Sequence, residues 1–380
     1  MDGQPRIFCD NATLETDAYG LYYETESAMS FHFEWSLRNK MGLARVLPVI
    51  IATFCAVLTV GLPVSTATAA PDRDQQRDGF DHPQVWFAPN DDLARGPNRD
   101  RYLNHDFPHL FDPTPAWDPK IDVFEISPMM GSVVGPNDEL NRINTFLTGR
   151  HIALAVGTGG VTMDNPGPAP GECGFGVEGM IRPGRNAGAF KRLKQLGLEV
   201  RYVALDEPLT YGHYYNKKNA CHYSIQDVAR RVAAEIAEIR QSFPNIRVVD
   251  EEAPSITTTV QWNADFPNWL KAYRDAADVP FDAVVFDLDW RQPWQTTVSA
   301  SLRAARGAGV RTGIILDGTG PGTTDADAIA AYKRNIEAVE ASGLKFDLVI
   351  VANWTPHPAR NLPQSDPDTL TSVLTWYRNR

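Results

Sequence analysis

The feature that most constrains the fold is a regular alternation of short apolar runs with amphipathic segments after residue 80. Each run is rich in Val, Ile or Phe and is almost continuously apolar, which is typical of strands covered on both faces. The expected strands are VWFAP (85–89), IDVFEIS (121–127), HIALAVG (151–157), VRYVALDE (200–207), IRVVDEE (246–252), FDAVVFDLDW (281–290), TGIILDG (312–318) and FDLVIVANW (346–354).

The segments between these runs carry helix signals. Residues 224–243 place their apolar side chains on one stripe, and Ser224 is expected to be the N-cap of that helix. Two further segments place a proline, Pro267 or Pro367, in the first turn of an expected helix after a capping aspartate, Asp265 or Asp366. Glycines are expected to end three helices before the next strand: Gly197, Gly309 and Gly343.

Eight strands alternating with helices predict an α/β fold, a (β/α)8 TIM barrel, with residues 70–380 as a single catalytic domain. The alternative is an open doubly wound sheet, which normally carries a glycine-rich phosphate-binding turn after its first strand. The VWFAPNDD segment has no such turn, and GTGG at 157–160 lacks the G-x-G-x-x-G spacing. The barrel is therefore the expected fold.

The N-terminal part has the layout of a secretory signal peptide over residues 41–69. Arg45 is followed by an apolar stretch (46–64) and a small-residue ending that offers a cleavage site after Ala69. A membrane anchor is the alternative, because the apolar stretch is nearly long enough to span a bilayer. Residues 1–40 are then expected to be a misread upstream extension, and the protein to be secreted to the cell exterior or the periplasm.

The cysteine content and the net charge limit the kinds of partner and cofactor that this protein is expected to bind. Cys173 and Cys221 follow the signal peptide, and an even pair in an oxidising compartment predicts a disulfide, with two buried free thiols as the alternative. No CxxC or HExxH spacing occurs, so neither a metal site nor a cofactor is expected. The formal net charge of −11 argues against nucleic acid and anionic membrane. A neutral or cationic partner or a small molecule fits better, bound by a monomer without stable membrane association.

Acidic residues gather at the carboxyl ends of the expected strands. In a TIM barrel these ends share one mouth, where catalytic residues collect. Paired carboxylates there can cleave a glycosidic bond, one protonating the leaving oxygen while the other attacks or activates water. Carboxylates can instead hold Mg²⁺ or Mn²⁺. The acids at these ends are Glu125, Asp206, Glu207, Asp250, Glu251, Glu252, Asp287, Asp289 and Asp317.

Aromatic residues close to these acids favour sugar chemistry. Aromatic faces suit the C–H faces of sugar rings, while the sugar hydroxyls bond to polar groups nearby. Core packing is the alternative for each tryptophan. The expected substrate-binding residues are Trp86, Glu125, Tyr211, Glu252, Trp290, Asn353 and Trp354.

Three strand ends resemble a known group of enzymes. ALDEP at the fourth strand, IILDG at the seventh and Trp354 at the eighth resemble secreted TIM-barrel glycoside hydrolases, in particular the retaining clan with catalytic acids on strands 4 and 7. The resemblance implies Glu207 as acid/base, Asp317 as nucleophile, and Trp354 under the sugar at the cleavage point. Asp206 stands where the clan has Asn and Asp317 where it has Glu, and the shorter side chain of Asp317 would favour inversion by widening the carboxyl separation.

The expected function is therefore a secreted glycosidase acting on a polysaccharide or oligosaccharide. Glu207 and Asp317 are the expected catalytic pair, and Asp287 and Asp289 are rivals for the second role. Asp206 is expected to raise the pKa of Glu207 by like-charge repulsion.

Two other functions stay open. One is a metal-dependent barrel lyase or isomerase that uses Glu207, Glu252 and Asp287 as metal ligands. The other is a non-catalytic barrel that binds carbohydrate through its aromatic residues. Loss of activity on chelation would identify the first, and sugar binding without turnover would identify the second.

Overall fold

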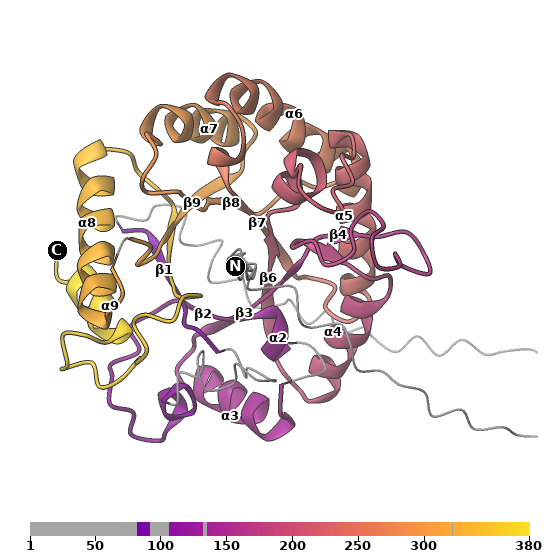
Figure 1. Ribbon diagram of the computed structural model, residues 1–380. Helices are drawn as coiled ribbons and strands as arrows, with labels where there is room; N and C mark the ends of the chain where they lie inside the picture. Colours follow the sequence, from indigo (N-terminus) through magenta and orange to yellow (C-terminus); the bar gives the residue numbers. More distant parts are fainter. Residues whose placement is uncertain (1–81, 92–105, 132–134, 321) are drawn as a thin grey trace, which may run out of the picture. The chain divides into compact units, whose positions relative to one another are not determined.

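Eight parallel strands close into a barrel in the computed structural model (Figure 1). The structure describes residues 82–91, 106–131, 135–320 and 322–380, so the expected extension and signal peptide lie outside the described residues. Strand β1 pairs with β10 as well as with β2, which closes the barrel and confirms the predicted TIM fold. The strands are β1 (Gln84–Ala88), β2 (Val123–Ile126), β3 (Ala153–Gly159), β6 (Val200–Asp206), β7 (Arg247–Glu252), β8 (Ala283–Phe286), β9 (Arg311–Leu316) and β10 (Leu348–Ala352).

Helices surround the strands on the outside of the barrel (Figure 1). They are α2 (Pro128–Gly131), α3 (Asn137–Thr148), α4 (Arg185–Gln195), α5 (Ile225–Arg240), α6 (Thr259–Ala277), α7 (Gln295–Gly307), α8 (Asp325–Ser342) and α9 (Leu370–Arg378). Shorter elements are η2 (Phe107–Phe111), the π-helical turn η3 (Thr210–Tyr214), η4 (Pro254–Ile256) and a two-stranded sheet of β4 (Val161–Thr162) and β5 (Met180–Ile181). Within the described ranges, none of the helices combines the length and apolar character needed to span a bilayer.

Several helix boundaries follow the sequence signals. The Ser224 side chain accepts a hydrogen bond from the backbone N–H of Asp227, as expected for the N-cap of α5. The three expected terminal glycines all adopt the left-handed conformation that L side chains rarely adopt. Their φ angles are 76° at Gly197, 74° at Gly309 and 69° at Gly343.

The two proline signals were wrong. Pro267 lies inside α6, whose N-cap is Thr258 rather than Asp265. The Thr258 hydroxyl accepts a hydrogen bond from the backbone of Gln261, so the helix begins two turns before its proline. Helix α9 likewise begins at Leu370, after Pro367 rather than around it.

The inside of the barrel is filled by alternate residues of the strands. Side chains of a strand point to opposite faces in turn, so one residue in two faces the barrel axis. The buried cluster on the axis is Trp86, Val123, Ala155, Tyr202, Val249, Ala283, Val285, Ile315, Leu348, Ile350 and Ala352. This alternation fixes which strand-end side chains reach the mouth.

Candidate active site

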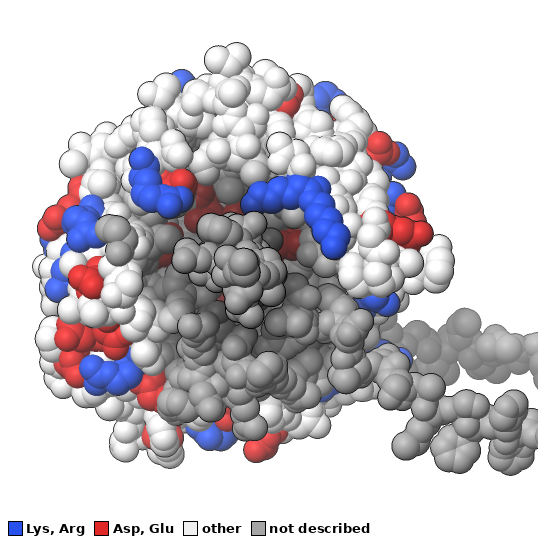
Figure 2. Space-filling view, in the orientation of Figure 1, with Lys and Arg blue, Asp and Glu red and all other residues white. Residues whose placement is uncertain are grey.

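Five carboxylates continue the inward-facing rows at the carboxyl end of the barrel. The rows run through Val123, Tyr202, Val249, Val285 and Ile315, and every second residue after them faces the axis. We call the resulting set the inner ring: Glu125, Asp206, Glu251, Asp287 and Asp317. Within the described part of the surface, Figure 2 shows acidic side chains in a hollow bordered by Lys and Arg side chains.

Glu207 leaves β6 beside the inner ring with an unusual backbone. Its φ is 48°, in the left-handed region that residues other than glycine rarely occupy. The Glu207 N–H donates to the carbonyl of Glu251 at 3.0 Å, and its own carbonyl accepts from the Tyr211 N–H at 2.9 Å. Such strained conformations cluster at functional sites, where the surrounding structure holds them in place.

Burial and mutual repulsion raise the pKa of most of these carboxyl groups. Burial, followed by the charge of Asp91, raises the pKa of Glu125 to about 8. Burial, followed by the charge of Asp317, raises the pKa of Asp287 to about 7. The pKa values of Asp206, Glu207 and Glu251 are held well above their usual range, first by burial and then by neighbouring carboxylates. Near neutral pH the site therefore holds both protonated and ionised carboxyl groups.

Asp317 is held by donors on both of its oxygens. Trp290 Nε1 donates to Asp317 Oδ2 at 3.0 Å, and the Thr319 N–H donates to Oδ1 at 2.6 Å. The Thr319 hydroxyl also donates to Oδ1. The side chain is 2% exposed, and burial raises its pKa although these hydrogen bonds lower it. Asp317 thus fixes the indole of Trp290, while its own oxygens are already engaged.

A pocket of about 240 Å³ opens beside the inner ring. Asp287 is the inner-ring residue that lines it, together with the indoles of Trp290 and Trp354. Trp354 follows β10 and is 42% exposed, an unusual exposure for so large an apolar side chain. The remaining lining residues are Ala253, Ser255, Leu288, Asp289, Arg291 and Thr319.

Asp289 also lines this pocket but differs from Asp287 in its bonding. Its Oδ1 accepts from Arg291 Nε at 2.7 Å and its Oδ2 from Arg291 Nη2 at 3.0 Å. The hydrogen bond from Arg291 lowers the pKa of Asp289. The lowered pKa and the ion pair with Arg291 favour the ionised form of this carboxylate, so it is a poor candidate for proton transfer.

The neighbours of Glu251 on β7 face the opposite way. Glu252 is fully buried, and its Oε1 accepts from the Leu209 N–H at 2.6 Å. Its Oε2 accepts from the N–H and the hydroxyl of Thr210 at 3.1 and 2.9 Å. Asp250 faces α6, where Trp269 Nε1 donates to it at 2.7 Å. These two acids hold neighbouring segments and do not reach the mouth.

This orientation corrects the expected role of Glu252. Glu252 was the expected substrate contact, whereas Glu251, expected only as one of the strand-end acids, faces the axis two residues after Val249. Every second residue of a strand faces the same side, so the buried Val249 would have identified Glu251 as the inward-facing acid.

Two other expected substrate contacts are structural. Trp86 is fully buried in the barrel, with its Nε1 donating to Gln84 Oε1 at 3.1 Å, so it belongs to the core and not to the mouth. Asn353 is 5% exposed and shapes the loop before Trp354. Its Nδ2 donates to the Pro358 carbonyl at 3.1 Å, and its Oδ1 accepts from the Thr355 N–H at 3.0 Å.

Tyr211 binds Glu178, an acidic residue that was not among the expected site residues. Its hydroxyl donates to Glu178, whose charge raises the pKa values of Asp206, Glu207 and Asp287. Glu178 lies on the long loop that follows β4, and no strand-end pattern marks it. The signal that the sequence offers for Glu178 is the length of that loop, because long loops inside a compact domain are often functional.

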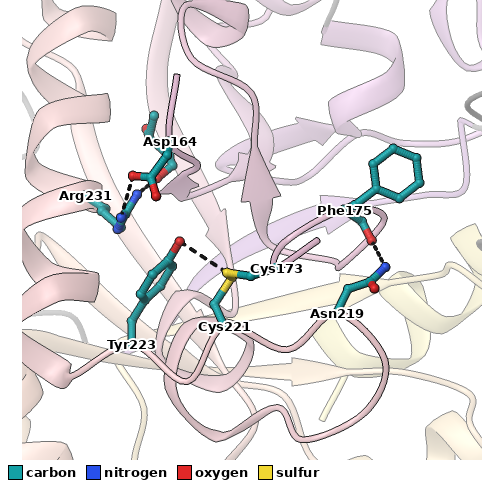
Figure 3. The surroundings of a disulfide bond; sticks show 8 residues. Asp164, Cys173, Phe175, Asn219, Cys221, Tyr223 and Arg231 are labelled. Carbon is teal, nitrogen blue, oxygen red and sulfur yellow. Dashed lines mark hydrogen bonds and ion pairs between the residues drawn. A yellow bond between two sulfur atoms is a disulfide. The ribbon is translucent and has the colours of Figure 1, made fainter. Parts of the chain in front are cut away.

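The predicted disulfide between Cys173 and Cys221 is present, with a Cα–Cα distance of 4.8 Å (Figure 3). It joins the loop after β4 to the segment after η3. Asn219 Nδ2 adds a hydrogen bond to the Phe175 carbonyl at 2.7 Å, in the same pair of segments. Two segments that flank Glu178 and Tyr211 are thus tied together.

The described residues offer no group of three or more His, Cys, Asp or Glu side chains arranged to hold a metal ion. Of the three ligands expected for a metal-dependent enzyme, Glu252 faces away from the mouth and binds the backbone of Leu209 and Thr210. The metal-dependent alternative therefore lacks one of its expected ligands.

No family model and no curated protein matches the sequence. Solved structures with a similar barrel include a candidate alpha-L-fucosidase from Bacteroides thetaiotaomicron VPI-5482, at a TM-score of 0.48 and 10% identity over 79% of this chain and 95% of that one. An HpcH/HpaI aldolase from Desulfitobacterium hafniense DCB-2 has a TM-score of 0.35 and 12% sequence identity, and the match covers 78% of this chain and 90% of that one. The intracellular xylanase TsXylA from Thermoanaerobacterium saccharolyticum has a TM-score of 0.39 and 12% sequence identity, and the match covers 73% of this chain and 90% of that one. These similarities concern the barrel and do not separate a glycosidase from an aldolase.

Proposed function

We propose that this protein is an exported glycoside hydrolase that cleaves an oligosaccharide or polysaccharide with two carboxyl groups. The observation that carries the proposal is the lining of one pocket by Asp287, Trp290 and Trp354 beside the inner ring. A carboxyl group with a pKa of about 7 suits glycosidic bond cleavage, and two indoles beside it suit the binding of a sugar ring.

Glu207 and Asp287 are the proposed catalytic pair. The pKa of Glu207 is held well above its usual range by burial and then by the charge of Asp287, which favours the protonated form that a proton donor needs. The pKa of Asp287 is about 7, so this group is substantially ionised at neutral pH. Two neighbouring carboxyl groups with raised pKa values can divide the acid and base roles between them. Glu207 protonates the leaving oxygen, and Asp287 attacks the sugar or activates water.

Asp317 supports Asp287 in this proposal, in place of the nucleophilic role that the resemblance implied. The charge of Asp317 makes the largest electrostatic contribution to the raised pKa of Asp287. Its hydrogen bond to Trp290 Nε1 fixes one wall of the pocket. Asp317 therefore tunes the second carboxyl group and orients an aromatic side chain.

The indoles of Trp290 and Trp354 are the proposed sugar-binding surfaces. Both line a pocket of about 240 Å³, below the ~300–1,000 Å³ of pockets for drug-sized ligands. A pocket of this size suits one sugar ring, whose C–H face packs on an indole while its hydroxyls bond to polar groups.

Export of the protein rests on two features. Residues 41–69 have the layout of a signal peptide, and the Cys173–Cys221 disulfide is of a kind that persists in oxidising compartments. Sequencing of the N-terminus of the protein recovered from the culture medium tests this point, and the expected first residue is Ala70.

The test of the activity is a polysaccharide panel with NMR analysis of the first anomer released. We expect one polymer to be cleaved, and the Asp287→Asn variant to lose this activity. Asp289→Asn is the matched control, because Asp289 lines the same pocket but is paired with Arg291. Equal losses in both variants would contradict the assignment of Asp287. Sugar binding without any turnover would identify a non-catalytic barrel, and loss of turnover on chelation would identify a metal-dependent enzyme.

A further inference from the structure

Glu125 carries an unpaired oxygen at the mouth of the barrel. The side chain is 8% exposed, and its buried Oε2 has no hydrogen-bond partner among the described residues. It faces the axis two residues after the interior Val123. Leaving a buried carboxylate oxygen unpaired is costly, so such a group calls for an explanation, of which a bound ligand is one.

A glycine on the neighbouring strand makes room for the Glu125 side chain. Gly157 on β3 occupies an inward position, two residues after the interior Ala155. A Cβ added at Gly157 would lie 3.3 Å from Glu125 Oε1, tighter than most real contacts. The absence of a side chain at Gly157 therefore lets the Glu125 carboxyl group lie against β3 at the level of the inner ring.

The charges that act on these groups are negative. Asp91 is the charged neighbour of Glu125, and Glu125 in turn acts on Asp206 and Glu251. Among the described residues, the charged groups that perturb Asp206, Glu207 and Glu251 are all carboxylates. This repulsion and burial favour the protonated forms of these carboxyl groups. A cationic ligand favours their ionised forms and relieves the repulsion, whereas a neutral ligand does neither.

An ammonium group matches this arrangement better than a metal ion does. Metal binding requires several oxygens grouped around one point, and the described carboxylates do not form such a group. An ammonium group has three N–H donors and needs only hydrogen-bond contact with separate acceptors. On a sugar ring, such a group is the protonated amine of an amino sugar.

We propose that the inner ring binds a sugar unit that carries a free, protonated amino group, and that Glu125 Oε2 accepts a hydrogen bond from it. This inference rests on the proposed function, because it names the substrate class of the same site. It makes Glu125 a specificity-determining residue, while Glu207 and Asp287 keep the catalytic roles.

The test compares oligosaccharides of glucosamine and galactosamine before and after N-acetylation, which removes the charge and keeps the linkage. Binding is measured by titration calorimetry with the Asp287→Asn variant, so that cleavage does not interfere. We expect the free amines to bind at least 10-fold more tightly than their acetylated forms. Adding Glu125→Gln should weaken binding of the free amine by about 10- to 100-fold, the loss typical of a charge-assisted hydrogen bond. Binding of neutral oligosaccharides of glucose and galactose should change less than twofold.

Glu139→Gln is the matched control. Glu139 is 9% exposed and has an unpaired buried Oε1, but it lies on α3 beside Arg142. It should leave the binding of every sugar unchanged. The inference is overturned if free and acetylated sugars bind equally well. It is also overturned if Glu125→Gln weakens the binding of neutral sugars as much as that of the free amines. Glycosidase activity could still stand in either case. If no sugar is cleaved by the wild-type protein, the proposed function fails, and the Glu125-dependent preference for free amines still decides the inference.

Discussion

At the scale of single residues, Glu207 carries the most specific prediction. If Glu207 supplies the proton, Glu207→Gln should lower kcat/KM on sugars with poor leaving groups by about 10²- to 10⁴-fold. The loss should be much smaller on activated aryl glycosides, because their leaving groups need little protonation. Steady-state kinetics on both substrate types measure the difference.

Asp206→Asn is the companion variant, since Asp206 adjoins Glu207 and helps raise its pKa by repulsion. This change should lower the pKa of Glu207 and retain most of the activity at acidic pH. If Asp206→Asn abolishes turnover while Glu207→Gln is tolerated, the proton donor is Asp206.

Asp317 allows a prediction about pH. Asp287 must be ionised to act as base or nucleophile, so activity should fall as the pH drops below its pKa of about 7. Because the charge of Asp317 raises this pKa, Asp317→Asn should lower it and move the acidic limb of the kcat/KM profile to lower pH. Asp289→Asn should move the limb less, because the charge of Asp289 contributes less and is paired with Arg291. A limb that stays in place in Asp317→Asn would show that Asp287 does not set it.

At the scale of elements, β7 shows why the strands could be predicted more easily than the site. Apolar runs and glycine C-caps mark strands and helix ends locally, so the eight strands were expected close to where they lie. Side chains along a strand alternate between the barrel axis and the outside, so the direction of a strand-end side chain depends on its exact position. An error of one residue exchanges the inward Glu251 for the outward Glu252. Pairing across the fold is also invisible in one sequence, as the contact of Asp317 with Trp290 illustrates.

The segment after β6 is held from both ends. Glu252 binds the backbone N–H groups of Leu209 and Thr210 at the start of η3. The Cys173–Cys221 disulfide holds the chain after η3. Between these anchors lies Tyr211, which binds both the Glu207 carbonyl and Glu178. The conformation of Glu207 is therefore held in part by elements outside the inner ring, in addition to its hydrogen bond to the Glu251 carbonyl.

Removal of the disulfide tests this arrangement. The bridge closes a loop with a sequence separation of 48 residues. In the chain-entropy model, such a loop stabilises the fold by about 4 kcal/mol. A variant with Cys173→Ser and Cys221→Ser should lose about this much free energy of unfolding in urea and should also show a lower kcat. An unchanged kcat at a temperature where the variant is fully folded would show that the bridge does not position Glu207.

At the scale of the whole molecule, burial of acids should make stability depend on pH. Burial raises the pKa values of Glu125 and Glu252 to about 8 and those of Glu235 and Asp287 to about 7. In the unfolded chain, Glu and Asp titrate near 4.3 and 3.9. Between about pH 5 and 8 the folded protein therefore holds protons that the unfolded chain has released. Stability is fully present below the unfolded pKa values and is lost as the pH rises through the folded ones.

The free energy of unfolding should therefore fall between pH 5 and pH 8, by ~1.4 kcal/mol per pH unit for each retained proton. Urea titrations at pH 5, 6, 7 and 8 measure the slope. Glu235→Gln provides the matched control, because Glu235 is 1% exposed on α5, outside the inner ring. Gln resembles the protonated acid in shape and cannot ionise, so this variant should show a shallower slope and lose less stability at pH 8. Stability that rises from pH 5 to pH 8 would mean that the buried carboxyl groups are ionised in the folded protein, and Glu207 could not then be the proton donor.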